Sequence, residues 1–300
     1  DVSTAGLRSD FQRWLADMGE INPDLTIRTD QAGLAGEAAA ISEAIDEPMN
    51  AREAWALFAR INPHLRDGHS GIAMPDARQA LQTHIEGGGR VLPFEVRFAR
   101  DGTLRVLASA TPGIAQGDRL VSINGAPVEQ LVDQMLARVP GDTERFRRAL
   151  LTRRFSAYYW FLFGDTRRYD IAFVGADGCA HNVRAEGASV LPVALQPTPD
   201  AGDLFEARVL PGAIGYLRID SFAHEEEAAL AAFAARAFAQ FRTQRIRALI
   251  IDVRENGGGW PSNMRKSNTC AFPRRGEAAR SRKCGWTARP STSPTWTWTC

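Results

Sequence analysis

The sequence predicts a multi-domain α/β protein, and two observations carry this prediction. Residues 248–253 are apolar except for Asp252, and a short apolar run of this length is typical of a strand buried on both faces, as in a parallel sheet. Residues 214–222 alternate polar and apolar side chains like a second strand, and a helical apolar stripe separates the two. Strand, helix and strand in this order predict a βαβ crossover with neighbouring parallel strands.

The helix of this unit is expected over about 225–242. Three glutamates stand in its first turn and Arg245 and Arg247 follow its end, an arrangement that the helix dipole favours. The second strand leads directly into Asn256 and the triple glycine Gly257, Gly258 and Gly259. Glycines allow a sharp turn with exposed N–H groups, and α/β proteins place their sites at the carboxyl ends of such strands.

Residues 1–90 are expected to form a helical N-terminal cap. Apolar residues recur at helical spacing, and Asn50-x-x-Glu53 resembles a capping box that opens a helix. A cap that buries its own apolar stripes is the simpler interpretation, and a lid or partner surface is the alternative.

Short strands are predicted from residue 91 onward. Residues 94–98 and 104–107 read as a hairpin, and Asn124-Gly125 marks another, followed by an apolar helical stripe from Val128 to Leu136. A helix near 143–163 and a hairpin over 168–183 come next. Residues 185–212, with four prolines, read as a loop or linker.

One histidine, His69, lies in a short motif of turn-forming and small residues, Asp67-Gly68-His69-Ser70-Gly71. Asp-Gly predicts a tight turn that exposes His69, whose ordinary pKa suits general-base work near neutrality. The alternative is a loop histidine satisfied by neighbouring backbone. The other four histidines lack such a context and are expected to serve packing or the surface.

Together these motifs resemble the tail-specific, or C-terminal processing, serine peptidases, a superfamily that includes the tricorn protease core and the interphotoreceptor retinoid-binding repeats. The resemblance lies in the order of residues 67–71, 117–128, 215–222 and 252–258, and it covers about residues 10–260. It implies a crotonase-like α/β core, a PDZ-like module in Gly117-Asp-x-Leu-x-Ser-Ile-Asn-Gly125, peptide or protein substrates, and an extracytoplasmic location. No Gly-Leu-Gly-Phe-like carboxylate-binding loop precedes the PDZ-like segment.

The resemblance divides the chain into a helical cap (1–90), a PDZ-like module (91–142), an incomplete peptidase core (143–259) and an aberrant tail (260–300). It suggests His69 as general base and Gly258 as an N–H donor to the oxyanion, supported by the turns around Asp67, Gly68, Asn256, Gly257 and Gly259. The family's nucleophilic serine follows the glycines in a Ser-Ala-x-Glu-like context, which this sequence lacks. Ser262 and Lys266, four residues apart in the tail, are interpreted as a chance pair.

Composition narrows the remaining possibilities. A formal net charge of +1 gives no reason to expect nucleic acid or an anionic membrane, and no apolar run reaches the length of a membrane span. Residues 260–300 contain no Leu, Ile or Val, yet hold three of the four cysteines. This break in composition resembles a reading-frame slip. The chain begins at Asp1 with no visible signal peptide, so it reads as mature or trimmed, and neither metal nor cofactor is expected.

Three functions therefore compete. The first is a serine-type peptidase, inactive in this form because the serine motif is missing. The second is a non-catalytic, peptide-binding PDZ-like module. The third, a phosphate cradle at the triple glycine, is disfavoured because the spacing of neither a P-loop nor a dinucleotide site is present.

Overall fold

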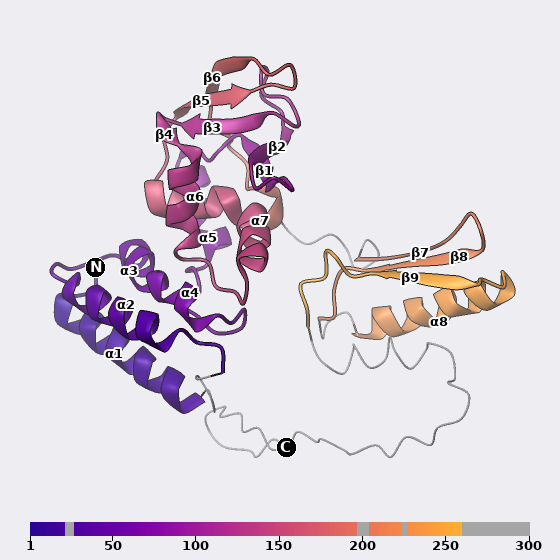
Figure 1. The fold of residues 1–300 in the computed structure, drawn as a ribbon, viewed down its shortest axis with the longest axis horizontal. Coiled ribbons are helices and arrows are strands. Elements are labelled where there is room, and N and C mark those ends of the chain that lie inside the picture. The colour runs from indigo at the N-terminus through magenta and orange to yellow at the C-terminus, as the bar shows by residue number, and fades with distance from the viewer. Residues whose placement is uncertain (22–26, 197–203, 224–226, 260–300) are drawn as a thin grey trace. The chain divides into compact units, whose positions relative to one another are not determined.

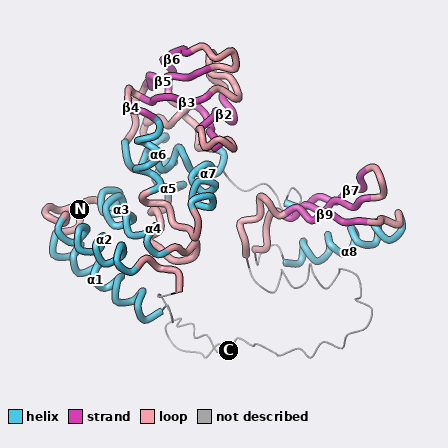
Figure 2. Tube along the Cα trace, viewed as in Figure 1, coloured by secondary structure: helices cyan, strands magenta, loops and turns pink. Residues whose placement is uncertain are grey.

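The computed structural model describes residues 1–21, 27–196, 204–223 and 227–259 (Figure 1). It divides into two compact units, Asp1–Pro197 and Thr198–Cys300, each with a hydrophobic core of its own. Figure 2 shows both helices and strands in each unit, so the predicted α/β class is confirmed. Within the described ranges, no helix has the length and apolar character needed to cross a membrane.

The first unit begins with helices whose starts are fixed by side-chain caps. Asn50 accepts hydrogen bonds from the backbone N–H groups of Arg52 and Glu53, and Glu53 accepts from the Asn50 N–H at 2.9 Å. The predicted capping box is therefore confirmed, and it satisfies donors that a helix start leaves unpaired. The helices are α1 (Thr4–Ile21), α2 (Gln31–Glu43), α3 (Ala51–Phe58), α4 (Asn62–Leu65) and α5 (Ala77–Glu86), with a 3-10 turn at Ala59–Ile61.

The apolar stripes of these helices bury one another. Phe11 of α1, Ile41 of α2 and Ile61 form one buried cluster, and the rings of Phe11 and Phe58 lie 4.9 Å apart. This packing agrees with a cap that uses its stripes for its own core.

An antiparallel sheet follows in the order β1-β2-β3-β5-β6, and the short β4 pairs with β3. Asn124 and Gly125 turn from β3 into β4 with φ of 50° and 79°, the left-handed values that an Asn-Gly hairpin requires. All three predicted hairpins are confirmed. The strands are β1 (Phe94–Phe98), β2 (Leu104–Ser109), β3 (Arg119–Ile123), β4 (Ala126–Pro127), β5 (Arg168–Val174) and β6 (Ala180–Glu186).

Two helices, α6 (Val128–Leu136) and α7 (Glu144–Phe163), fill the core against this sheet. Four aromatic side chains of α7 are buried in this core, namely Phe155, Tyr158, Tyr159 and Phe161. Trp55 of α3 joins the same core, with its ring 5.3 Å from that of Phe161 in α7.

Residues 90 and 142, where the sequence suggested divisions, both lie within the first compact unit, and the division into cap, module, core and tail stays a prediction. The sheet that begins with β1 continues through β5 and β6, and α7 shares its core. Antiparallel pairing of β3 with β5 joins segments on both sides of residue 142. The structural division falls instead at Pro197 and Thr198.

The second unit contains the strand–helix–strand arrangement predicted from the sequence. Strands β8 (Ile214–Ile219) and β9 (Ala248–Asp252) are parallel neighbours in register from Ile214 with Ala248 to Arg218 with Asp252, and α8 (Glu227–Thr243) connects them. The side chains of Leu230, Phe238 and other α8 residues pack against one face of the sheet. The predicted crossover is confirmed.

A third strand of this sheet contradicts the prediction of a loop over 185–212. Strand β7 (Phe205–Leu210) pairs antiparallel with β8. Phe205, Ala207 and Val209 alternate with Glu206 and Arg208, the period of a strand with one covered face. The neighbouring prolines obscured this alternation.

The prediction that β9 is buried on both faces is also wrong. Ile250 and Ile251 in β9, and Val253 just after it, each expose 46% of their surface. Among the described strands β9 pairs only with β8, so it forms an edge of the three-stranded sheet. The apolar character of the strand predicted an interior position in the sheet, with a neighbouring strand on each side. Among the described residues β9 has one neighbouring strand, β8.

Candidate functional site

The glycine turn after β9 is held by the side chain of Asn256. Its amide donates to the Ile219 carbonyl at 2.9 Å, and its carbonyl oxygen accepts the Gly258 N–H at 2.7 Å. The Phe222 N–H in turn donates to the Gly258 carbonyl at 2.9 Å. One asparagine thus ties the turn to the carboxyl end of β8.

Glycine is required at the end of this turn. Gly258 and Gly259 have φ of 99° and 142°, which favour glycine strongly. A Cβ at Gly259 would overlap the carbonyl group of Phe222, with which Gly259 forms a parallel bridge. Gly257 has open space where a Cβ would stand. The sequence pointed to close backbone approach here, and the approach occurs at Gly259.

The expected oxyanion donor has a partner in this structure, because the Gly258 N–H donates to Asn256. For the N–H groups of Gly257 and Gly259, by contrast, the described residues supply no hydrogen-bond acceptor. The sequence identified the turn as a source of N–H donors but could not show that Asn256 accepts the middle one.

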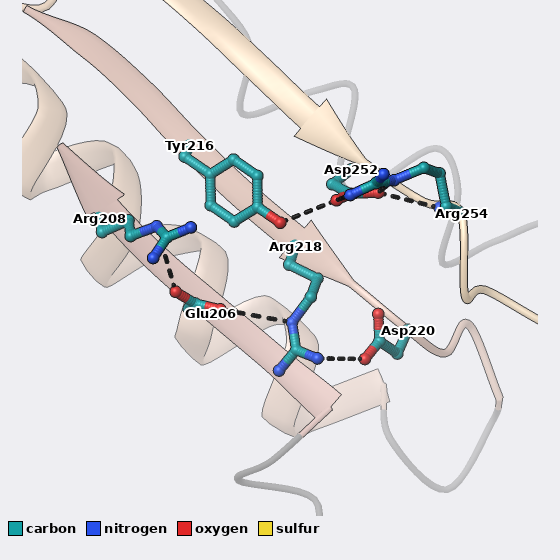
Figure 3. A network of polar contacts seen from close by, with 7 residues as sticks. All are labelled: Glu206, Arg208, Tyr216, Arg218, Asp220, Asp252 and Arg254. Atoms are coloured by element: carbon teal, nitrogen blue, oxygen red, sulfur yellow. Dashed lines mark hydrogen bonds and ion pairs between the residues drawn. The ribbon is translucent and has the colours of Figure 1, made fainter. Parts of the chain in front are cut away.

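Asp252 is the centre of a polar network beside this turn (Figure 3). It is 8% exposed and accepts hydrogen bonds from the Tyr216 hydroxyl at 2.8 Å and from the Arg254 guanidinium at 2.7 and 2.9 Å. The hydrogen bonds from Arg254, with that from Tyr216, hold the pKa of Asp252 well below its ordinary value. The same contact raises the pKa of Tyr216. Asp252 is therefore ionised near neutral pH, and these hydrogen bonds hold its carboxylate in position.

The network continues across the sheet face opposite α8. Glu206 lies 3.3 Å from Arg208 and 3.5 Å from Arg218, which is also 2.9 Å from Asp220. The Arg208 guanidinium lies 4.6 Å from the centre of the Tyr216 ring. In the strand register, Glu206 pairs with Arg218 and Arg218 with Asp252, which places these alternate residues on one face (Figure 3). This face of the sheet carries charged side chains, whereas the opposite face packs against α8 and forms the hydrophobic core.

The His69 loop belongs to the first unit. The Asp67 carboxylate accepts hydrogen bonds from the His69 backbone N–H at 3.0 Å and the Ser70 hydroxyl at 2.6 Å. Although partial burial acts to raise the pKa of Asp67, the hydrogen bonds from Ser70 and His69 outweigh it and lower this pKa. The His69 imidazole is fully exposed, with Nδ1 3.5 Å from Asp67. The predicted exposure of His69 is confirmed.

Two side chains that the sequence did not single out fix this loop. Asp142 accepts the Gly68 N–H at 2.9 Å. Asn62, only 1% exposed, donates to the carbonyls of Ile72 and Arg138 at 3.0 and 2.9 Å and accepts the Ile72 N–H at 2.7 Å. The His69 loop is therefore anchored at both ends. Asn62 is the first residue of the short helix α4, and the sequence gives no clear signal of its role.

The structure brings together some of the predicted residues. Asp67 and Gly68 lie with His69 in the first unit, and Asn256, Gly257, Gly258 and Gly259 lie together in the second. Ser262 and Lys266 are outside the described residues. Tyr216 and Arg254 were missed, although alternation along β8 places Tyr216 on the polar face.

The three other histidines in the described ranges each have a neighbouring carboxylate, and His224 lies outside these ranges. His84 Nε2 lies 3.0 Å from Asp165, His181 Nε2 lies 3.5 Å from Asp118, and His64 Nδ1 lies 3.7 Å from Asp30. Across the described ranges, no three His, Cys, Asp or Glu side chains gather as metal ligands would.

A parallel strand pair with an α crossover and a glycine turn after the second strand is typical of an α/β enzyme. The sequence gives the class: residues 213–282 match the profile of peptidase family S41, which covers β8, α8, β9 and the glycine turn and continues past Gly259. Over this segment the chain is similar to peptidase family S41, which agrees with the predicted resemblance to the tail-specific serine peptidases. No curated protein sequence matches the chain.

Solved structures resemble the chain at the level of the fold. A crystal structure of a CPAF mutant aligns with a TM-score of 0.53 and 15% identity, covering 84% of this chain and 57% of that one. Mature CPAF complexed with lactacystin aligns with a TM-score of 0.47 and 14% identity, covering 77% and 52%. The chain spans about half the length of the solved structures it matches.

Proposed function

We propose that this chain is part of a serine-type peptidase that cleaves peptide or protein substrates by acyl transfer. The observation that carries the proposal is the match of residues 213–282 to peptidase family S41, over the segment that forms the β8–β9 pair and its glycine turn. Acyl transfer requires a nucleophile, a base and N–H donors that stabilise the oxyanion. The chain offers candidates for the last two.

His69 is the candidate base. Its exposed imidazole stands on a loop fixed by Asp67, Asp142 and Asn62, so the loop backbone is held while the ring is accessible. Gly258 is the candidate oxyanion donor. Because its N–H donates to Asn256, we assign Asn256 the role of holding the turn until the developing oxyanion competes for that N–H. Gly257 and Gly259 supply adjacent N–H groups.

Of the three groups that acyl transfer requires, the nucleophile is the one for which the chain offers no candidate. The serine context of the family is absent from these 300 residues, so we propose that they do not hydrolyse peptides on their own. Loss of one member of a catalytic triad lowers the rate by orders of magnitude. By the same resemblance we propose an extracytoplasmic location.

Fluorophosphonate labelling and a peptide-cleavage assay test the proposal. The 300-residue chain is compared with a version extended past Gly259 in the alternative reading frame of its coding sequence. We expect labelling and turnover only in the extended version, and their loss in its His69→Ala variant with unchanged folding. Labelling of Ser262 in the 300-residue chain, or full turnover after His69→Ala, would refute the assignment.

A peptide-binding role without catalysis remains the second candidate, because β1 is an edge strand. Among the described strands it pairs with β2 alone, and PDZ-like modules bind peptides by adding a strand to such an edge. Titration with free peptides, measured beside the labelling experiment, separates this role from hydrolysis.

A further inference from the structure

A hollow in the first unit is lined by arginines. It has a volume of about 540 Å³, and the described residues that line it are Arg90, Arg167, Arg168 and Glu186. Arg90 precedes β1, Arg167 and Arg168 stand at the start of β5, and Glu186 ends β6. Three guanidiniums and one carboxylate leave two positive charges in excess at this point of a chain whose formal net charge is only +1.

The backbone beneath these side chains is fixed. The Arg90 N–H donates to Asp165 at 3.1 Å, and the Gly187 N–H donates to the Arg167 carbonyl at 3.0 Å. A Cβ at Gly187 would stand 2.5 Å from Cβ of Arg90, so the glycine permits the close approach that gathers the arginines. The hollow is thus held by tertiary hydrogen bonds and does not depend on the long side chains alone.

The three arginines differ in how their donors are used. Arg168 contacts one oxygen of Glu186, through Nε at 3.3 Å and Nη2 at 3.2 Å. Arg90 donates from Nη1 to the carbonyls of Gly88 and Gly89, and these bonds orient its guanidinium. The other N–H groups of this guanidinium stay available to a ligand. The Arg167 guanidinium has no polar partner among the described residues. Guanidinium groups bind carboxylates through paired, charge-assisted hydrogen bonds.

We propose that this hollow binds an acidic peptide segment, with neighbouring Asp or Glu side chains placed against Arg90 and Arg167. Glu186 on Arg168 shows that a carboxylate fits this group of guanidiniums. The guanidiniums of Arg90 and Arg167 contact no carboxylate among the described residues, so they match a ligand with two carboxylates close together. The binding needs neither a nucleophile nor the glycine turn of the second unit, so it does not depend on the proposed peptide hydrolysis.

Binding of fluorescent octapeptides to the whole 300-residue chain tests this inference. An amidated peptide with adjacent glutamates is compared with its glutamine analogue, with a neutral peptide bearing a free C-terminus, and with inorganic phosphate as competitor. Arg167→Ala removes one ligand contact, and Arg167→Lys keeps the charge but loses the paired geometry. Arg100→Ala, an exposed arginine on the β1–β2 turn, is the matched control for loss of charge. Circular dichroism checks that each variant is folded.

We expect the glutamate peptide to bind and the glutamine analogue not to bind. Arg167→Ala should weaken binding at least about tenfold, since a hydrogen bond to a charged group contributes that much. Arg167→Lys should recover only part of the loss, and Glu186→Gln should strengthen binding by releasing Arg168. Higher salt should weaken it throughout.

Three results would overturn the proposal. Equal losses in Arg167→Ala and Arg100→Ala would indicate general attraction to the charged surface. Phosphate that displaces the peptide at equal concentration would assign the hollow to small anions. Binding that needs a free C-terminus and ignores the glutamates would assign it to chain ends.

Discussion

Replacing Gly259 by alanine should open the glycine turn, and the structure allows the cost to be estimated. A side chain at φ of 142° costs about 1–3 kcal/mol, because this region is almost restricted to glycine. The new Cβ would also overlap the Phe222 carbonyl, and moving apart breaks the hydrogen bond from the Phe222 N–H to Gly258, worth about 1 kcal/mol. The expected destabilisation of the turn is therefore about 2–4 kcal/mol.

Hydrogen exchange measured by mass spectrometry checks this estimate on the peptide covering residues 214–223. The destabilisation corresponds to exchange about 30- to 1000-fold faster at the carboxyl end of β8. Gly257→Ala is the matched control, because its Cβ meets open space and its φ is not positive. We expect it to change stability by no more than about 0.5 kcal/mol. Equal exchange in the two variants would show that the bridge to Phe222 does not hold the turn.

Three further outcomes are expected. Asn256→Ala should destabilise the turn by about 1–3 kcal/mol, because the Ile219 carbonyl loses its donor, and exchange at residues 219–223 should rise; unchanged exchange would contradict this. Asp252 has a lowered pKa in the folded state, so its stabilising contribution is complete above pH of about 4 and is lost as pH falls below that value. The stability of Asp252→Asn should therefore lack this loss at acid pH. Identical acid-unfolding profiles of the variant and the parent chain would count against the network. Asn62→Ala should lower the stability of the first unit by about 2–4 kcal/mol in thermal unfolding, whereas Asn182→Ala, on the outer strand β6, should change it little.

The elements predicted correctly are those specified by nearby residues. Asn50 and Glu53 stand three residues apart and close their capping box within one turn. Asn124 and Gly125 set the β3–β4 hairpin through their own backbone preferences. The β8–β9 pair is more distant in sequence, but the helix between its strands allows essentially one topology.

The errors arose where the outcome depends on distant neighbours. The burial of Ile250 and Ile251 depends on whether a further strand or helix lies against β9, which the strand's own composition cannot reveal. The partner of the Gly258 N–H depends instead on local geometry, because the carbonyl oxygen of Asn256, two residues earlier, accepts it. Hydrogen-bond partners two residues apart in an irregular turn follow from backbone angles that the sequence leaves open.

The strand order of the second unit also determines when its parts can form during translation. Strands β7 and β8 are joined by a short turn at 211–213 and can pair as soon as both have left the ribosome. Strand β9 must follow α8, because parallel neighbours require a crossover. Among the described strands of this sheet, the apolar run from Ala248 to Ile251 is therefore the last to be synthesised. Closure of the crossover packs Leu249 against the α8 core, but Ile250 and Ile251 stay partly exposed in the folded unit. These two side chains can therefore meet other nascent chains both before and after closure.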